Sequence, residues 1–111
     1  MLHMTAEEVA NRVDSELASC TDLDNWHGID LDNIGKFRLS PMRSEFIDPS
    51  TNLTPSLWVV IDEIPESHTD GYLVVFDEAS GYFGLAVKGS PGQSGTVVGV
   101  YGNRVETLNA M

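Results

Sequence analysis

The segment Ser56–Tyr101 decides the fold. It holds four apolar runs: SLWVVIDEI at 56–64, GYLVVF at 71–76, YFGLAV at 82–87 and TVVGVY at 96–101. These runs are rich in Val, Ile and aromatic residues, which favour strands, and they are separated by Pro, Gly, Asp and Ser. Short connections between consecutive strands are typical of an antiparallel meander. The run at 57–64 is almost continuously apolar, which predicts an interior strand covered on both faces.

The segments between these apolar runs predict turns, and the segment before the first run predicts a further strand. Residues 77–81 form a short hairpin connection in which Gly81 can supply a positive φ. A second turn is expected at 48–52, and a flexible loop at 89–95. Phe37 and Leu39 alternate with charged residues, which predicts a half-buried strand that Pro41 confines to an edge or a break.

A helix is expected at each end of the chain. Thr5 and Glu8 have the spacing of a capping box, and an apolar stripe at helical period follows, which predicts a helix from about Ala6 to Cys20. Asn103 and Glu106 indicate the start of a short C-terminal helix. We therefore expect a single α+β domain over residues 1–111. It has an N-terminal helix, an antiparallel meander sheet of four to five strands and a short C-terminal helix, with both helices on one face of the sheet.

The excess of acidic residues indicates which kinds of molecule the chain can bind. The chain carries 17 acidic and 6 basic residues, a formal net charge of −11. Such a chain repels nucleic acid and anionic membranes and attracts basic proteins, although high solubility alone is the other interpretation. The sequence has no apolar run of about 18 residues and no signal-peptide pattern, which predicts a cytoplasmic protein. A single cysteine, Cys20, rules out an internal disulfide and is expected to be a buried thiol.

No motif in the sequence predicts catalysis, a metal or a cofactor. Carboxylates at 22 and 24, and again at 30 and 32, begin like calcium loops, but the later positions of such a loop are wrong. The three histidines lack ligand or triad spacing. Asp62 and Glu63 are adjacent on one strand, so they should point to opposite faces. We therefore expect no catalytic residue, metal or cofactor.

The segment 21–35 is the best candidate for a binding site. Its aspartates alternate with apolar residues, which indicates a structured acidic loop, and an aromatic residue inside a charged rim is typical of binding hot spots. Trp26 is that aromatic residue, although it could equally plug the base of its own loop. The predicted partner-binding residues are Asp22, Asp24, Trp26, Asp30 and Asp32.

The second half of the chain resembles a known group of proteins. The residues that carry the likeness are LWVV at 57–60, GYLVVFD at 71–77, FGLA at 83–86, VGVYG at 98–102 and ETLNAM at 106–111. This pattern is similar to small bacterial immunity-like or uncharacterised proteins found beside polymorphic and contact-dependent toxins. The resemblance implies neither catalytic residues nor a cofactor, and no contact residue follows from it.

The leading hypothesis is a cytoplasmic, immunity-like inhibitor that binds a basic toxin domain of nuclease type by protein–protein contact. Because a nuclease site is basic, an acidic inhibitor would steer onto it. The alternative is a small ligand-binding or enzymatic domain with a pocket between helices and sheet, lined by Tyr72, Tyr82 or Tyr101. A third interpretation is an oligomerising structural protein with an exposed sheet edge. The sequence leaves the oligomeric state open.

Overall fold

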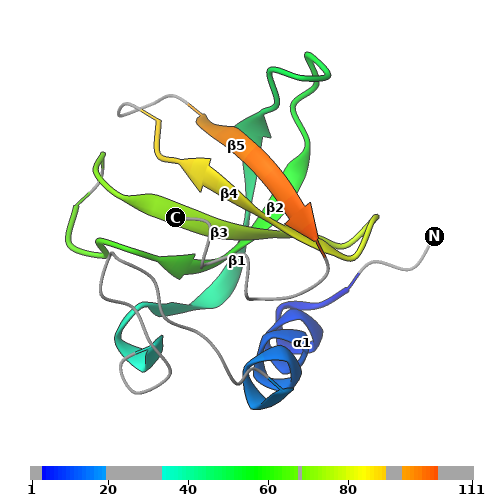
Figure 1. The fold of residues 1–111 in the computed structure, drawn as a ribbon, viewed down its shortest axis with the longest axis vertical. Coiled ribbons are helices and arrows are strands. Elements are labelled where there is room, and N and C mark those ends of the chain that lie inside the picture. The colour runs from blue at the N-terminus through cyan, green and yellow to red at the C-terminus, as the bar shows by residue number, and fades with distance from the viewer. Residues whose placement is uncertain (1–3, 20–33, 68, 90–93, 103–111) are drawn as a thin grey trace.

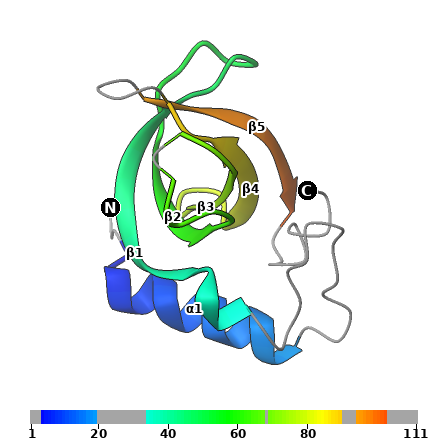
Figure 2. The same cartoon turned by 90° about the vertical axis from the view of Figure 1, so that its left-hand side faces the viewer.

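The fold is a five-stranded barrel with one helix packed against its outside. A computed structural model describes residues 4–19, 34–67, 69–89 and 94–102. The elements run in the order α1 (Ala6–Ser19), a 3₁₀ turn (Ile34–Lys36), β1 (Arg38–Ile47), β2 (Ser56–Asp62), β3 (Tyr72–Asp77), β4 (Tyr82–Val87) and β5 (Gly95–Gly102). Figures 1 and 2 show the strands curving around a common axis while α1 lies across the outside.

Helix α1 begins as the capping box predicts. The amide of Thr5 donates to Glu8 Oε1 at 3.0 Å, and the amide of Glu8 donates to Thr5 Oγ1 at 3.2 Å. These two bonds satisfy amides that have no partner within the first helical turn. Val9 and Val13 of the apolar stripe are fully buried against the barrel. The predicted helix is therefore confirmed through Ser19.

The sheet closes on itself, which the sequence did not predict. Consecutive strands pair antiparallel from β1 to β5, and β1 also pairs with β5 in parallel through Phe46↔Gly95 and Ile47↔Thr96. Gly95 is required at this seam, because a Cβ there would lie 2.5 Å from the carbonyl oxygen of Val87 and 2.8 Å from the Phe46 ring. The meander prediction is confirmed, and the parallel seam is the addition that turns the meander into a barrel.

Closure creates two buried regions, because successive side chains of a strand point to opposite faces. The barrel interior is filled by one cluster, and α1 covers a second cluster on the outer face. The interior cluster contains Phe46, Leu57, Val59, Leu73, Val75, Ala86 and Val97. The outer cluster contains Val9, Val13, Ile34, Trp58, Val60, Ile61, Val74, Phe76, Phe83 and Leu85. Strand β2 contributes to both clusters, so the prediction of a strand buried on both faces is confirmed.

Strand β1 differs in detail from its prediction. It continues through Pro41 to Ile47, and its pairing with β2 shifts register between Arg38 and Met42. Pro41 lies within that irregular stretch, where its missing N–H removes no regular ladder bond. Proline therefore distorts the strand without ending it.

Three predictions fall outside the described residues. These are the C-terminal helix within 103–111, the thiol of Cys20 and most of the loop at 89–95. Among the described elements, α1 is the one α-helix, and no described helix has the length and apolarity needed to cross a membrane.

Candidate functional site: an acidic hollow at one end of the barrel

The predicted partner-binding residues cannot be placed. Asp22, Asp24, Trp26, Asp30 and Asp32 all lie outside the described residues. The predicted site thus stays a prediction, and the described residues form a different candidate site.

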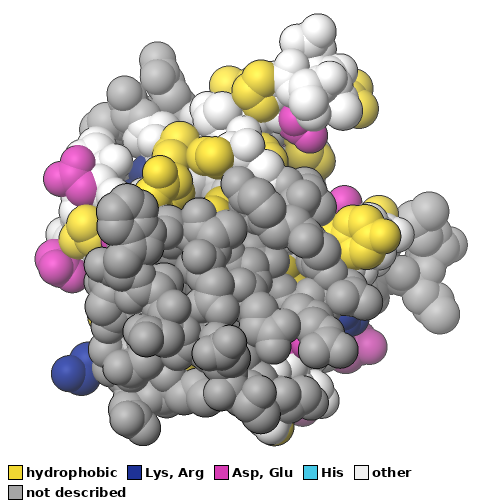
Figure 3. Space-filling view, in the orientation of Figure 1, with side chains coloured by type: hydrophobic (Ala, Val, Ile, Leu, Met, Phe, Trp, Pro, Cys, Tyr) yellow, Lys and Arg dark blue, Asp and Glu magenta, His cyan; other side chains and the backbone are white. Residues whose placement is uncertain are grey.

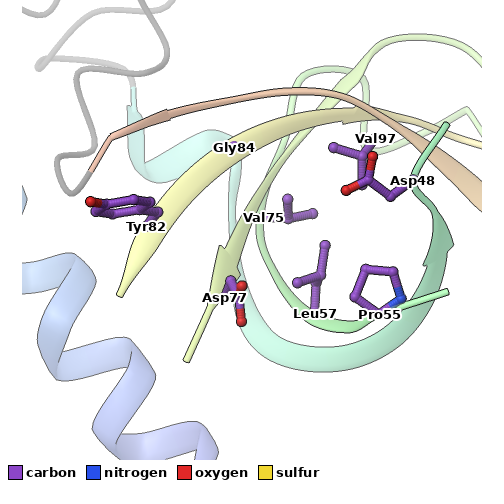
Figure 4. Close-up of a pocket in the computed structure, with 8 residues that line it drawn as sticks. All are labelled: Asp48, Pro55, Leu57, Val75, Asp77, Tyr82, Gly84 and Val97. Atoms are coloured by element: carbon purple, nitrogen blue, oxygen red, sulfur yellow. The ribbon is translucent and has the colours of Figure 1, made fainter. Parts of the chain in front are cut away.

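That part contains a hollow at the end of the barrel that carries the β1–β2 and β3–β4 connections. Its volume is about 50 Å³. Residues from all five strands or their ends contribute to its wall, so the barrel fold alone brings them together. The lining residues are Asp48, Pro55, Leu57, Val75, Asp77, Tyr82, Gly84 and Val97, and we call this site the acidic hollow (Figure 4).

The floor of the acidic hollow is apolar and buried. Leu57, Val75 and Val97 belong to the buried interior cluster of the barrel. Gly84 lies between Phe83 and Leu85 on β4, so it faces inward, and its lack of a side chain leaves room at the floor. The space therefore arises where β4 contributes no side chain to an otherwise filled interior.

Each of the two carboxylates at the hollow is held by its own turn. Asp48 Oδ1 accepts from the amide of Ser50 at 3.0 Å and from its hydroxyl at 2.7 Å. Asp77 Oδ1 accepts from the amide of Ala79 at 3.0 Å, and Asp77 Oδ2 accepts from the Ser80 hydroxyl at 3.1 Å. These are Asx-type turns, which fix the direction of the side chain. The predicted turns at 48–52 and 77–81 are confirmed, and Gly81 has the expected positive φ of 75°.

The carboxylates lie on opposite sides of the floor. In Figure 4, Asp48 lies on one side of Val75 and Leu57, and Asp77 lies on the other. Tyr82 is the cross-strand partner of Asp77 and is 48% exposed, and in Figure 4 its ring points away from the floor. Within the described residues, neither Asp48 nor Asp77 pairs with a lysine or arginine of the chain itself. The hollow thus combines an apolar floor, two carboxylates without a basic partner there and an exposed aromatic ring.

Two other acidic residues, Asp62 and Glu63, stabilise the β2–β3 connection. Lys88 Nζ contacts Asp62 Oδ1 at 2.8 Å and donates to the carbonyl oxygens of Ile64 and Ser67 at 2.9 and 2.6 Å. Asp62 Oδ1 also accepts from the amide of Ile64, and Glu63 Oε1 accepts from the amide of Tyr72 at 2.9 Å. Asp62 and Glu63 therefore have different partners and together fix the β2–β3 connection.

The described residues show no metal centre. No group of three or more His, Cys, Asp or Glu side chains within them is placed to hold a metal ion. The acidic hollow has two carboxylates, and both already accept hydrogen bonds from their turns. The hollow thus offers an apolar floor and two carboxylates that no lysine or arginine of the described residues pairs with.

Sequence reasoning found this site only in part. Tyr82 was a candidate pocket residue and Asp77 was assigned to a turn, whereas Asp48 was seen only as the start of another turn. The pocket was expected between helix and sheet, but the described interface between α1 and the barrel is occupied by the outer cluster. The hollow lies instead at the barrel end.

The described residues thus form a small α+β barrel with a hollow that two carboxylates line at one end. No protein-family model, no curated protein and no solved structure matches the chain.

Proposed function

We propose that this protein is a non-catalytic, acidic binding protein that engages a basic protein partner. The proposed role is that of an immunity-like inhibitor, which neutralises a basic toxin domain of nuclease type by covering its active site. The proposed contact includes Asp22, Asp24, Trp26, Asp30 and Asp32. A nuclease toxin attacks nucleic acid inside the cell, so we place the inhibitor in the cytoplasm.

The proposal rests on one observation: most of the few basic residues form ion pairs within the chain itself. Four of the six basic residues form ion pairs with carboxylates of the same chain: Arg12 with Glu16, Arg38 with Asp14, Arg43 with Glu78 and Lys88 with Asp62. Four basic side chains are thus engaged internally, and the other 13 acidic and 2 basic residues of the chain account for the net charge of −11. On the described part of the face in Figure 3, acidic side chains occur in several separate places and basic areas are small.

This charge distribution supports electrostatic steering. A surface of one sign accelerates association with a partner of opposite sign and rejects partners of like sign, such as nucleic acid. The partner's basic groups would also find carboxylates that no internal lysine or arginine occupies. Inhibition of this kind needs shape and charge and no chemistry from the inhibitor.

The experiment that tests the proposal measures binding and inhibition together. The purified chain captures partners from a lysate of its source at about 0.1 M and about 1 M NaCl, between which the Debye length shortens from about 10 Å to about 3 Å. The captured protein is then assayed for nuclease activity with and without the chain. We expect a basic protein that binds faster at low salt and loses nuclease activity in the complex.

A variant with Asn at positions 22, 24, 30 and 32 tests the proposed contact. We expect it to associate more slowly and to inhibit more weakly than the natural chain. An association rate that does not respond to salt, or a captured partner that stays fully active, would contradict the inhibitor proposal.

One observation favours a second candidate function. Tyr82 lines the acidic hollow, as the small-ligand alternative expects of a tyrosine-lined pocket. Pockets for drug-sized ligands, however, measure about 300–1,000 Å³. A hollow of about 50 Å³ would accept a ligand group of only a few heavy atoms.

A further inference from the structure

We propose that the acidic hollow binds the end of one lysine side chain from a basic protein partner. This inference rests on the proposed function, because it names the group that the partner presents. It adds a second contact, on the described part of the chain, to the one proposed at residues 22–32.

The size of the hollow fits the end of a lysine side chain. One water molecule needs about 10–15 Å³ of such space, so a hollow of about 50 Å³ has room for about three to four water-sized groups. The last methylenes of lysine and its ammonium group are of that size. The guanidinium group of arginine is planar, branched and broader, so it fits this space less well.

The lining matches the two chemical parts of the lysine side chain. Leu57, Val75 and Val97 offer an apolar floor to the methylenes, as the long stems of lysines commonly lie along apolar surface. Asp48 and Asp77 on either side of that floor offer carboxylate oxygens to the ammonium donors. A lysine stem lying on this floor would therefore bring its ammonium group to one of the two carboxylates.

The site is prepared for a cation before binding. The turns of Asp48 and Asp77 hold both carboxylates in place, so little side-chain entropy is lost when the cation enters. Oδ2 of Asp48 makes no hydrogen bond within the described residues, so it is available to an ammonium donor.

Blocked tripeptides test the site without any knowledge of the partner. The probes are acetyl-Gly-Lys-Gly-amide and two counterparts. The norleucine peptide keeps the methylenes and lacks the charge, and the arginine peptide keeps the charge on a broader group. Binding is followed by NMR chemical-shift changes in the 15N-labelled full chain. We expect the lysine peptide to shift the amides around Asp48, Asp77 and Tyr82 with a millimolar Kd, and the norleucine peptide to bind at least about fivefold more weakly.

Matched variants separate the local site from the overall charge. The variant D48N/D77N keeps one side-chain oxygen at each position for the turn amides of Ser50 and Ala79, since Asn favours the same turns as Asp. At position 77 the amide NH2 replaces the oxygen that accepts from the Ser80 hydroxyl, and it can donate to that hydroxyl instead. The control E66Q/D70N removes two charges as well, from exposed residues of the β2–β3 connection at the opposite end of the barrel. We expect D48N/D77N to weaken lysine binding about fivefold and the control to change it less than about twofold.

Three results would overturn the proposal: equal binding of the lysine and norleucine peptides, tighter binding of the arginine peptide, or equal loss in both double variants. If D48N/D77N does not fold, the single variants D48N and D77N take its place, and unchanged lysine affinity in both overturns the site. The outcome is independent of the inhibitor experiment. If the lysine peptide binds but no basic protein is captured, the proposed function is contradicted and the lysine site stands. If a basic protein is captured and inhibited but the lysine peptide does not bind, the lysine site is contradicted and the proposed function stands.

Discussion

The buried ion pair of Lys88 gives the sharpest test of the structure. The Lys88 side chain is 9% exposed and that of Asp62 is 12% exposed. The ammonium group has three donors, and its three partners are Asp62 and the carbonyl oxygens of Ile64 and Ser67. The lysine therefore fastens the β2–β3 connection to the end of β4.

Replacing this lysine should cost a large part of the stability of the domain. Lys88→Met leaves the Asp62 carboxylate and two carbonyl oxygens without their donor. Breaking a buried pair from one side costs about 3–5 kcal/mol. Because about a tenth of each side chain still reaches water, we expect the lower end, about 3 kcal/mol. Asp62→Asn keeps an oxygen for the Ile64 amide and leaves Lys88 its two carbonyls, so we expect about 1–2 kcal/mol.

Urea unfolding followed by far-UV circular dichroism measures these free energies. Lys36→Met is the matched control, since Lys36 is exposed and makes no ion pair within the described residues; its free energy of unfolding should change by less than about 0.5 kcal/mol. A loss below about 1 kcal/mol for Lys88→Met, or equal losses at Lys88 and Lys36, would refute the reasoning.

Three further substitutions test other parts of the fold, each by the same unfolding measurement. Gly95→Ala should cost about 1–3 kcal/mol, because the added Cβ meets the Val87 carbonyl and the Phe46 ring at the seam; a neutral effect would contradict the close approach. Gly81→Ala should cost about 1–2 kcal/mol through its φ of 75° alone, since no atom lies within 4 Å of the added Cβ; a loss well above this would reveal a contact that the structure lacks. Val9→Ala should cost about 2 kcal/mol, because its side chain is fully buried between α1 and the barrel; a loss under about 0.5 kcal/mol would show that α1 does not pack there.

The sequence predicted those parts of the fold that depend on neighbouring residues. Thr5 and Glu8 are three residues apart, and their reciprocal bonds form as predicted. The turn at Gly81 was predicted from the glycine itself. Strand β2, which is buried on both faces, was predicted from a nearly continuous apolar run.

Features that need residues from distant strands could not be predicted. The seam pairs Phe46 with Gly95, and nothing in either local pattern indicates that the two meet. The acidic hollow likewise takes Asp48, Asp77 and Tyr82 from three separate strand ends. The buried ion pair of Lys88 with Asp62 also joins distant residues. The sequence indicates it only through the position of Lys88 directly after an apolar strand. The partner-binding residues predicted at 22–32 stay a prediction.

The seam between β1 and β5 also determines where the barrel opens first. Within the described residues, two residue pairs join β1 to β5, whereas six join β3 to β4. Local openings in native proteins start where the fewest contacts must break. We therefore expect backbone amides at the seam to exchange with deuterium sooner than those in the centre of β3. An opened seam would leave β1 and β5 as free edges that can pair with those of a second molecule, so exchange of strands between chains is the form of misassembly to which this barrel is most exposed.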